Sequence, residues 1–253
     1  MKPVCLVIGA GAGIGGNVAR KFALEGYHSV LCRRSDADGL ERMVREIRDQ
    51  GGQATGYLLN AAEADTIEAR VAAVEAEIGP IDVAVYNLGA QIGDRALAGT
   101  SLKAFEMGWR LGTFGLFRLA AALMPHMVQR GTGTLLVTSA TAAMRGNGGQ
   151  HSHAAAMGGR RMLCQTLNAE FAPRGIHVAH IVIDGAVDAP DTLGKMLGPD
   201  RFAELRETRG GTHDGLMLPA EIANTYFQLA RQHRSARTFE LDLRAFSDRA
   251  WWN

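Results

Sequence analysis

Short apolar runs alternate along the chain with longer stretches in which apolar residues recur at helical spacing. The first run, residues 4–8, ends in glycines, and residues 17–24 after it have the period of an amphipathic helix. This alternation predicts strands at 4–8, 29–31, 53–59, 81–86, 133–138, 177–183 and 238–243, and helices at 17–24, 38–50, 65–78, 101–130, 152–171 and 219–232. Strands that are apolar throughout and alternate with helices are typical of a parallel sheet covered on both faces. The pattern therefore predicts an α/β fold with a doubly wound parallel sheet.

One domain accounts for the whole chain, residues 1–253, because this length fits a single α/β domain and no repeat or linker interrupts it. The longest stretch without a periodic pattern is about 184–218, which carries many glycines and charges. It follows a predicted strand, and open α/β sheets bind ligands beyond the carboxyl ends of their strands. Two interpretations stay open for it: a lid over a ligand, or a plain surface excursion.

Composition and charge narrow the classes of partner. The 27 basic and 26 acidic side chains give a formal net charge of +1, so no overall field favours nucleic acid or an anionic membrane. Cys5, Cys32 and Cys164 are too few and too scattered for a disulfide framework, and buried free thiols fit a reducing cytoplasm. No run approaches the ~20 apolar residues of a spanning helix, and no signal peptide precedes the first strand. We therefore expect a cytoplasmic protein that binds neither membrane nor nucleic acid.

A glycine-rich turn joins the first strand to the first helix. It contains Gly9, Gly11, Gly13, Ile14 and Gly15. Glycines let the chain turn tightly and approach a pyrophosphate closely, and the helix N-terminus offers its N–H groups to the phosphates. Because strand, turn, helix and second strand all fall within the first 31 residues, the turn predicts a dinucleotide site in a Rossmann-type domain.

The end of the second strand indicates which dinucleotide is bound. An NAD enzyme has an acidic ribose ligand here, whereas this chain has Cys32 followed by Arg33 and Arg34. Arginine can hold a 2′-phosphate through paired hydrogen bonds, so the sequence favours NADP over NAD. The alternative is a solvated basic turn beside Asp36 and Asp38.

Several motifs, in the right order, resemble those of the short-chain dehydrogenase/reductase family over essentially the full length. They are the turn at 8–15, Tyr86-Asn87-Leu88-Gly89 after the fourth strand, Ala169 to Val178, which is similar to the family's AxELAPxGIRV segment, and Asp184-Gly185 in place of PG. The resemblance implies an oxidoreductase with a nicotinamide cofactor. It assigns cofactor contacts to Asn60, Asn87, Gly89, Gly185 and Val187. Asn87 also has a purely structural interpretation, as a cap on a strand end.

The four catalytic residue types of that family are missing at the matching positions. The family's asparagine, serine, tyrosine and lysine fall on Gly112, Ala140, His153 and Met157. A shift of the alignment does not restore them, because no tyrosine lies between positions 86 and 226 and no lysine between 103 and 195. Loss of a positioned proton donor typically costs a factor of ~10²–10⁴ in rate.

Other polar residues remain near these positions. His153 can donate a proton near neutral pH without an activating lysine, and Ser139 and Thr141 can orient a carbonyl. The alternatives are that His153 fills space and that the two hydroxyls bond locally to the backbone. For Arg160 and Arg161 we expect solvent or a partner subunit. A metal site is not expected, because the strand histidines at 177 and 180 show no partner ligands.

Two functional hypotheses follow. In the first, the protein is an NADP(H)-dependent oxidoreductase acting on a small carbonyl or alcohol through a rebuilt proton-transfer site. In the second, it binds the cofactor without turnover, as a sensor or as the inactive partner subunit of a hetero-oligomer. The intact glycine turn argues against a scaffold that binds no nucleotide. We also expect a homodimer or homotetramer formed through helices 101–130 and 152–171, with the apolar Trp251-Trp252 tail contributing.

Overall fold

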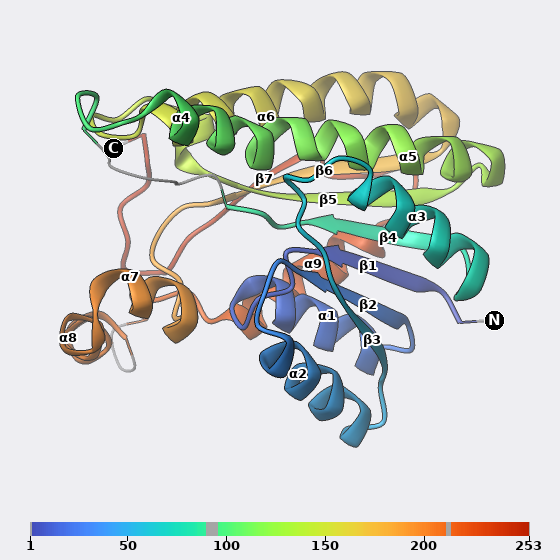
Figure 1. Cartoon of the computed structure of the whole chain (residues 1–253), viewed down its shortest axis with the longest axis horizontal. Coiled ribbons are helices and arrows are strands. Elements are labelled where there is room, and N and C mark those ends of the chain that lie inside the picture. Colours follow the sequence, from blue (N-terminus) through green and yellow to red (C-terminus); the bar gives the residue numbers. More distant parts are fainter. Residues whose placement is uncertain (1, 90–95, 211–213, 253) are drawn as a thin grey trace.

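The computed structural model describes residues 2–89, 96–210 and 214–252. Within these ranges, seven parallel strands form one sheet in the order β3-β2-β1-β4-β5-β6-β7 (Figure 1). The strands are β1 (Val4–Ile8), β2 (His28–Arg33), β3 (Gln53–Leu58), β4 (Ile81–Tyr86), β5 (Gly133–Ala140), β6 (Ile176–Ile183) and β7 (Glu240–Leu243). The order runs outward in both directions from the β1–β4 pair, as in a doubly wound sheet. The predicted fold class is confirmed.

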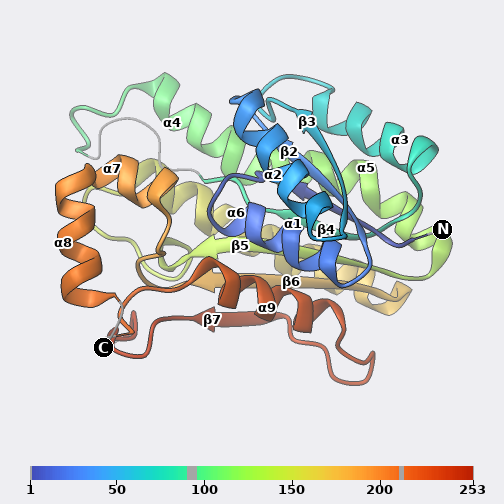
Figure 2. The same cartoon turned by 90° about the horizontal axis from the view of Figure 1, so that it is seen from below.

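Helices cover both faces of the sheet. One face carries α3 (Thr66–Glu77), α4 (Leu102–Trp109), α5 (Gly115–Arg130) and α6 (His151–Phe171), and the other carries α1 (Ile14–Leu24), α2 (Ala37–Asp49) and α9 (Pro219–Ala230) (Figure 1 and Figure 2). Successive residues of β1 serve the two cores: Leu6 clusters with Leu119 of α5, whereas Val7 clusters with Phe22 of α1. This two-sided burial explains why the strands are apolar at every position.

The ends of the predicted elements lie within three residues of the observed ones. The predicted helix at 101–130 differs in its interior: it consists of α4, a π-helical turn η1 (Arg110–Phe114) and α5. Single π-helical turns inside α-helices often occur at functional sites. The periodicity of the sequence indicates the helix but not the extra residue in that turn.

The segment at 184–218 is not irregular, contrary to the prediction. It contains a π-helical turn η4 (Pro190–Gly194), the short helix α7 (Lys195–Leu197) and the 11-residue helix α8 (Pro199–Arg209); residues 211–213 lie outside the described part. Gly198, at a φ of 87°, and Pro199 at the first helical position form a strong helix start. Phe202 is the one buried residue of α8. A helix with so little core contact has no apolar period, which explains why the pattern missed it.

One helical stretch of the described chain, Leu102–Arg130, is long and apolar enough to cross a membrane by length and composition alone. This differs from the expectation that no run approaches that length. Half of its apolar window is buried inside the protein, and a core helix of a soluble protein passes the same test. The finding is therefore weak evidence for a membrane span.

After β7 the chain returns to the carboxyl ends of the strands and is held there. The main-chain N–H of Trp251 donates to Asp184 at 3.1 Å, and its indole N–H donates to Asp242 at 3.0 Å. Arg244 forms ion pairs with the same two carboxylates and lies 4.3 Å from the ring centre of Trp252. Trp252 is 58% exposed. The two tryptophans of the expected apolar tail thus make part of their contacts within the chain.

Candidate cofactor site and active site

A cavity of about 250 Å³ opens at the carboxyl ends of the central strands. The glycine turn contributes Ile14, and the segments after β4 and β6 contribute Asn87, Gly89 and Val187. From β5 and α6 come Ser139, Ala140, His153, Met157 and Arg160. The cavity therefore brings together residues that the sequence assigns to the cofactor and residues at the family's catalytic positions.

The glycine turn is packed too tightly for larger residues at two positions. Gly9 has a φ of 97°, and a Cβ there would lie 2.7 Å from the carbonyl oxygen of Asn87. At Gly15 a Cβ would lie 2.2 Å from the carbonyl oxygen of Gly9. The side-chain amide of Asn87 donates to that same oxygen at 2.9 Å, which ties the end of β4 to the turn. Asn87 thus both caps the turn and lines the cavity.

Gly11 differs, because apart from its two neighbours along the chain no described residue lies within 4 Å of a Cβ at this position. Neither packing nor a positive φ explains a glycine at this position, and the backbone is left open to an approaching ligand. The first turn of α1, which starts after Gly13, has no side-chain cap, and the N–H of Gly16 donates to the carbonyl oxygen of Gly11 at 2.7 Å. A helix N-terminus without a side-chain cap, next to a glycine with free space above its backbone, can accommodate a pyrophosphate.

A second, polar cavity lies between α1 and α2, next to the turn. Arg20, Arg33 and Arg42 line it, together with Asn17 and three carboxylates. Arg33 is held by Asp36 at 3.0 Å. The backbone N–H of Gly39 holds the pKa of the Asp36 carboxyl below its usual range, and Arg33 and Arg42 act in the same direction.

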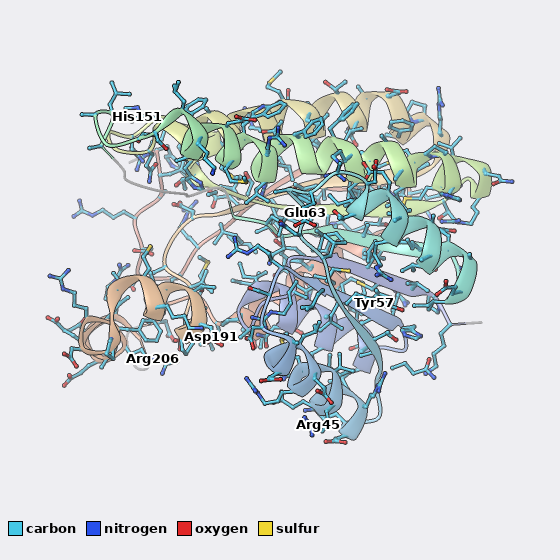
Figure 3. All side chains as sticks on the ribbon, viewed as in Figure 1. Arg45, Tyr57, Glu63, His151, Asp191 and Arg206 are labelled. Carbon is cyan, nitrogen blue, oxygen red and sulfur yellow. The ribbon has the colours of Figure 1, made fainter. Side chains whose placement is uncertain are left out.

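The three carboxylates of this cavity are Asp36, Glu46 and Asp191. Asp191 comes from the segment before α7, which approaches α1 and α2 in Figure 3. Arg34 is exposed and does not line this cavity. Of the two arginines identified from sequence, Arg33 therefore faces the cavity, while Arg20 and Arg42 were missed. The sequence gives little indication of them, since Arg20 is next to Lys21 on α1 and Arg42 lies on the highly charged helix α2.

The π-helical turn η1 is bonded to the sheet through its carbonyl groups. The hydroxyl of Tyr86 donates to the carbonyl oxygen of Leu111 at 2.5 Å. A Cβ at Gly115 would lie 2.2 Å from that hydroxyl, so the glycine permits the approach. The hydroxyl of Thr113 donates to the carbonyl oxygen of Ala156 in α6 at 2.7 Å. Gly112, at the position of the family's asparagine, is buried in this turn.

The position of Arg160 differs most from what the sequence predicted, namely contact with solvent or with a partner subunit. Instead of facing solvent it is 1% exposed and donates to three carbonyl oxygens, those of Gly112 (2.7 Å), Thr138 (2.5 Å) and Leu88 (2.8 Å). Its guanidinium also lies 5.2 Å from the ring centre of Tyr86. The signal was present in the sequence, because Arg160 interrupts a buried apolar stripe of α6.

The positions of the family's other catalytic residues form an apolar wall. Met157 is 2% exposed, and its sulfur lies 3.9 Å from the hydroxyl oxygen of Ser139. Ala140 lines the cavity without offering a polar group. His153 lines the cavity from the first turn of α6 and is the titratable imidazole of its described lining. Thr141 belongs to a 3₁₀ turn and is not among the lining residues.

Of three further residues predicted to contact the cofactor, one lines a cavity and two do not. Val187 lines the main cavity. Asn60 follows β3, and its side-chain amide donates to Glu63 at 2.8 Å. Gly185 has a φ of 144°, and a Cβ there would lie 2.6 Å from the Asp248 carboxylate of the C-terminal segment. Asn60 and Gly185 line neither cavity.

A buried polar cluster lies below the cavity, between β6 and β7. His180, whose side chain is fully buried, contacts the Glu240 carboxylate at 3.0 Å, and Arg161 pairs with the same carboxylate at 2.7 Å. Arg161 is thus bound within the chain rather than free for a partner. Burial lowers the pKa of His180 to about 4 against the opposing effect of Glu240, and Arg160 and Arg161 lower it further. His180 is therefore neutral at pH 7.

Comparisons with known proteins identify a family whose sequence model matches most of the chain. The sequence model of the family described as short chain dehydrogenase matches residues 3–193. The short-chain reductase protein NovJ of Streptomyces niveus is 34% identical over 242 residues, covering 94% of this chain and 91% of that protein.

Two solved structures are similar over nearly the whole chain. A short-chain dehydrogenase from Rhodopseudomonas palustris has a TM-score of 0.79 at 30% identity, covering 96% of this chain and 99% of its own. An alcohol dehydrogenase from Thermococcus sibiricus, complexed with 5-hydroxy-NADP, has a TM-score of 0.81 at 25% identity, and 98% of each chain is covered.

The buried His180 predicts a specific loss of stability in mild acid. Its folded pKa is about 4 and its unfolded pKa about 6.5, so the unfolded chain binds more protons between these values. We expect the free energy of unfolding to fall as pH drops from about 6.5 to 4, by up to about 3 kcal/mol from this residue. Urea unfolding across that range should show a shallower slope in His180→Leu. His151→Leu, at an exposed position, is the matched control; an unchanged slope in His180→Leu would contradict the assignment.

Proposed function

The chain belongs to the short-chain dehydrogenase family, and from this premise we propose that it binds NADP(H) and catalyses hydride transfer to or from a small carbonyl or alcohol. One observation carries the proposal. The cavity that begins at the glycine turn with Ile14 continues without interruption to His153 and Ser139. A ligand bound along the turn would therefore place its far end beside a proton donor and a hydroxyl.

The cofactor, when bound, would supply a hydride donor or acceptor. The chain's own contribution is to hold it: Gly11 and the N-terminus of α1 accommodate the pyrophosphate, and Arg33 and Arg42 meet the 2′-phosphate in the polar cavity. Asp191, Val187 and Thr192 border the two cavities from the segment before α7. We therefore favour the interpretation of 184–218 as a cover over the cofactor.

His153 is the proposed proton donor and acceptor. An imidazole carries and releases a proton near neutral pH, and His153 lines the cavity at the position that the family gives to its tyrosine. The hydroxyl of Ser139, next to Ala140, is the proposed partner of the substrate oxygen. Thr141 is the weaker candidate, since it does not line the cavity.

A second candidate function is cofactor binding without turnover, in a sensor or in the inactive subunit of a hetero-oligomer. The specific observation in its favour is the apolar wall formed by Met157 and Ala140, which offers no group to a reacting oxygen. Loss of catalytic groups with retention of a glycine turn is compatible with such a role.

We further propose a homo-oligomer in the cytoplasm. The three buried free cysteines fit a reducing compartment. At the end of α4, in the π-helical turn and at the start of α5, the rings of Trp109, Phe114 and Phe117 stack in a row and are 38–53% exposed. An apolar groove between α5 and α6 lies beside Phe117. A second copy of the chain would remove these rings from water.

NADP(H) is expected to bind at least tenfold more tightly than NAD(H), because a charge-assisted bond to the 2′-phosphate contributes roughly 1.5–3 kcal/mol. Replacing Arg33 and Arg34 together by alanine should weaken NADP⁺ binding by about 10–100-fold and NAD⁺ binding little, as measured by calorimetry. Arg45→Ala, on the outer side of α2 (Figure 3), is the matched control. Equal affinity for both cofactors in the wild type would remove the assignment.

His153→Ala should lower cofactor-dependent turnover of a carbonyl by ~10²–10³ while leaving NADPH affinity nearly unchanged, because the glycine turn is not altered. His151→Ala, two residues away and exposed, is the control and should keep full activity. Wild-type rates in His153→Ala would exclude the histidine mechanism. If no carbonyl or alcohol is turned over, yet NADPH still raises the melting temperature by mass action, the second function is favoured.

Phe117→Glu should convert the oligomer to monomer, because the added carboxylate would have to be buried in an apolar interface. Light scattering at micromolar concentration measures the change. Leu24→Glu is the control: Leu24 is 48% exposed at the end of α1, on the opposite side of the sheet. A wild-type protein that is already monomeric would rule the oligomer out.

A further inference from the structure

A positive charge is buried directly behind the main cavity. Arg160 lines the cavity beside Met157 and is 1% exposed. Its three hydrogen bonds go to carbonyl oxygens, which are dipoles and carry no net charge. Its burial lowers the pKa of the guanidinium, but arginine remains protonated at physiological pH.

No carboxylate within the described part of the chain forms an ion pair with Arg160. Its neighbour Arg161 pairs with Glu240, and the partly buried Arg118 pairs with Glu68 at 2.6 Å. The described lining of the cavity also contains no Asp or Glu. Among the described residues no acid pairs with Arg160, and its side chain is almost fully shielded from bulk water, so the field of its charge extends into the cavity.

We propose that Arg160 biases the bound nicotinamide toward its reduced form. The inference rests on the proposed function, which brings the nicotinamide end of the cofactor into this cavity. The oxidised ring carries a positive charge and the reduced ring carries none; the two differ by one hydride, a proton with two electrons, taken from an alcohol or given to a carbonyl. A buried cation beside the ring disfavours the oxidised form alone.

The size of this effect on cofactor binding depends on the distance between the two positive charges and on the effective dielectric constant between them. Two unit charges about 10 Å apart at an effective dielectric constant of about 20 repel strongly enough to change a binding constant roughly tenfold. A tenfold tighter binding of the reduced form raises the potential of the bound two-electron couple by about 30 mV. Bound NADP⁺ is thus the stronger oxidant and bound NADPH the weaker reductant, so the equilibrium on the enzyme shifts about tenfold toward alcohol oxidation.

The experiment compares dissociation constants for NADPH, NADP⁺ and 2′-phospho-ADP-ribose, which lacks the nicotinamide. Four variants are used: Arg160→Gln and Arg160→Met remove the charge, Arg160→Lys keeps it, and Arg161→Met is the matched control because Glu240 already neutralises Arg161. Fluorescence and calorimetric titrations at pH 7 give the constants, and circular dichroism verifies the fold of each variant.

The wild type should bind NADPH about tenfold more tightly than NADP⁺. In Arg160→Gln and Arg160→Met the ratio should fall to within about twofold, mainly through tighter NADP⁺ binding, while Arg160→Lys and Arg161→Met keep the wild-type ratio. Affinity for 2′-phospho-ADP-ribose should stay constant in all folded variants. If the role of Arg160 were purely structural, its replacement by Gln or Met would weaken the binding of all three ligands by a similar factor.

A wild-type ratio below twofold, or the same ratio in a folded Arg160→Gln as in the wild type, would overturn the inference. If neither neutral variant folds, the wild-type ratio and that of Arg160→Lys decide it. Failure of the proposed function has a different signature: neither NADPH nor NADP⁺ would bind, whatever residue stands at position 160.

Discussion

A buried guanidinium holds together the elements that shape the cavity. Arg160 on α6 bonds the segment after β4 through Leu88, strand β5 through Thr138 and the π-helical turn through Gly112. Burying a charge is costly unless its donors are satisfied, and a planar fork with donors on three nitrogens can meet three separate carbonyl groups at once. Arg160 therefore links the π-helical turn, which Tyr86 and Thr113 also bond, to two strand ends, and it places a charge behind the cavity.

Backbone groups form most of the part of the site proposed to hold the cofactor, whereas side chains form the part proposed to carry out the reaction. Glycines, a helix N-terminus and main-chain carbonyl groups form the first, and these depend on backbone geometry, which the tight packing of Gly9 and Gly15 fixes. Side chains form the second, and each of them can change without disturbing the sheet. This difference is compatible with the proposal that the chain keeps a cofactor cradle although Met157 and Ala140 stand at positions that the family resemblance assigns to polar catalytic groups.

The sequence predicted the sheet and the helices on its faces because each of these elements buries a periodic apolar surface. It missed α8, where Phe202 alone is buried, and the π-helical turn, which adds one residue without breaking the apolar stripe. In the site it identified the glycine turn, Arg33, Asn87 and His153 as lining residues. It misplaced Arg160, although this residue interrupts the apolar stripe of α6, because charged residues are seldom buried and the three carbonyl groups come from distant segments.

The apolar side chain of Met157 is consistent with the buried positive charge of Arg160 one helical turn away. The family's lysine would stand at position 157, and both side chains line the cavity one helical turn apart. An ammonium beside an unpaired guanidinium would repel it in a poorly screened cavity, so a chain with arginine at 160 favours an apolar residue at 157. A positive charge is therefore present on this face of α6, one helical turn beyond position 157. In the proposed mechanism the imidazole of His153 takes the place of the phenol, while positions 112 and 140 carry no side chain that can replace an asparagine or a serine.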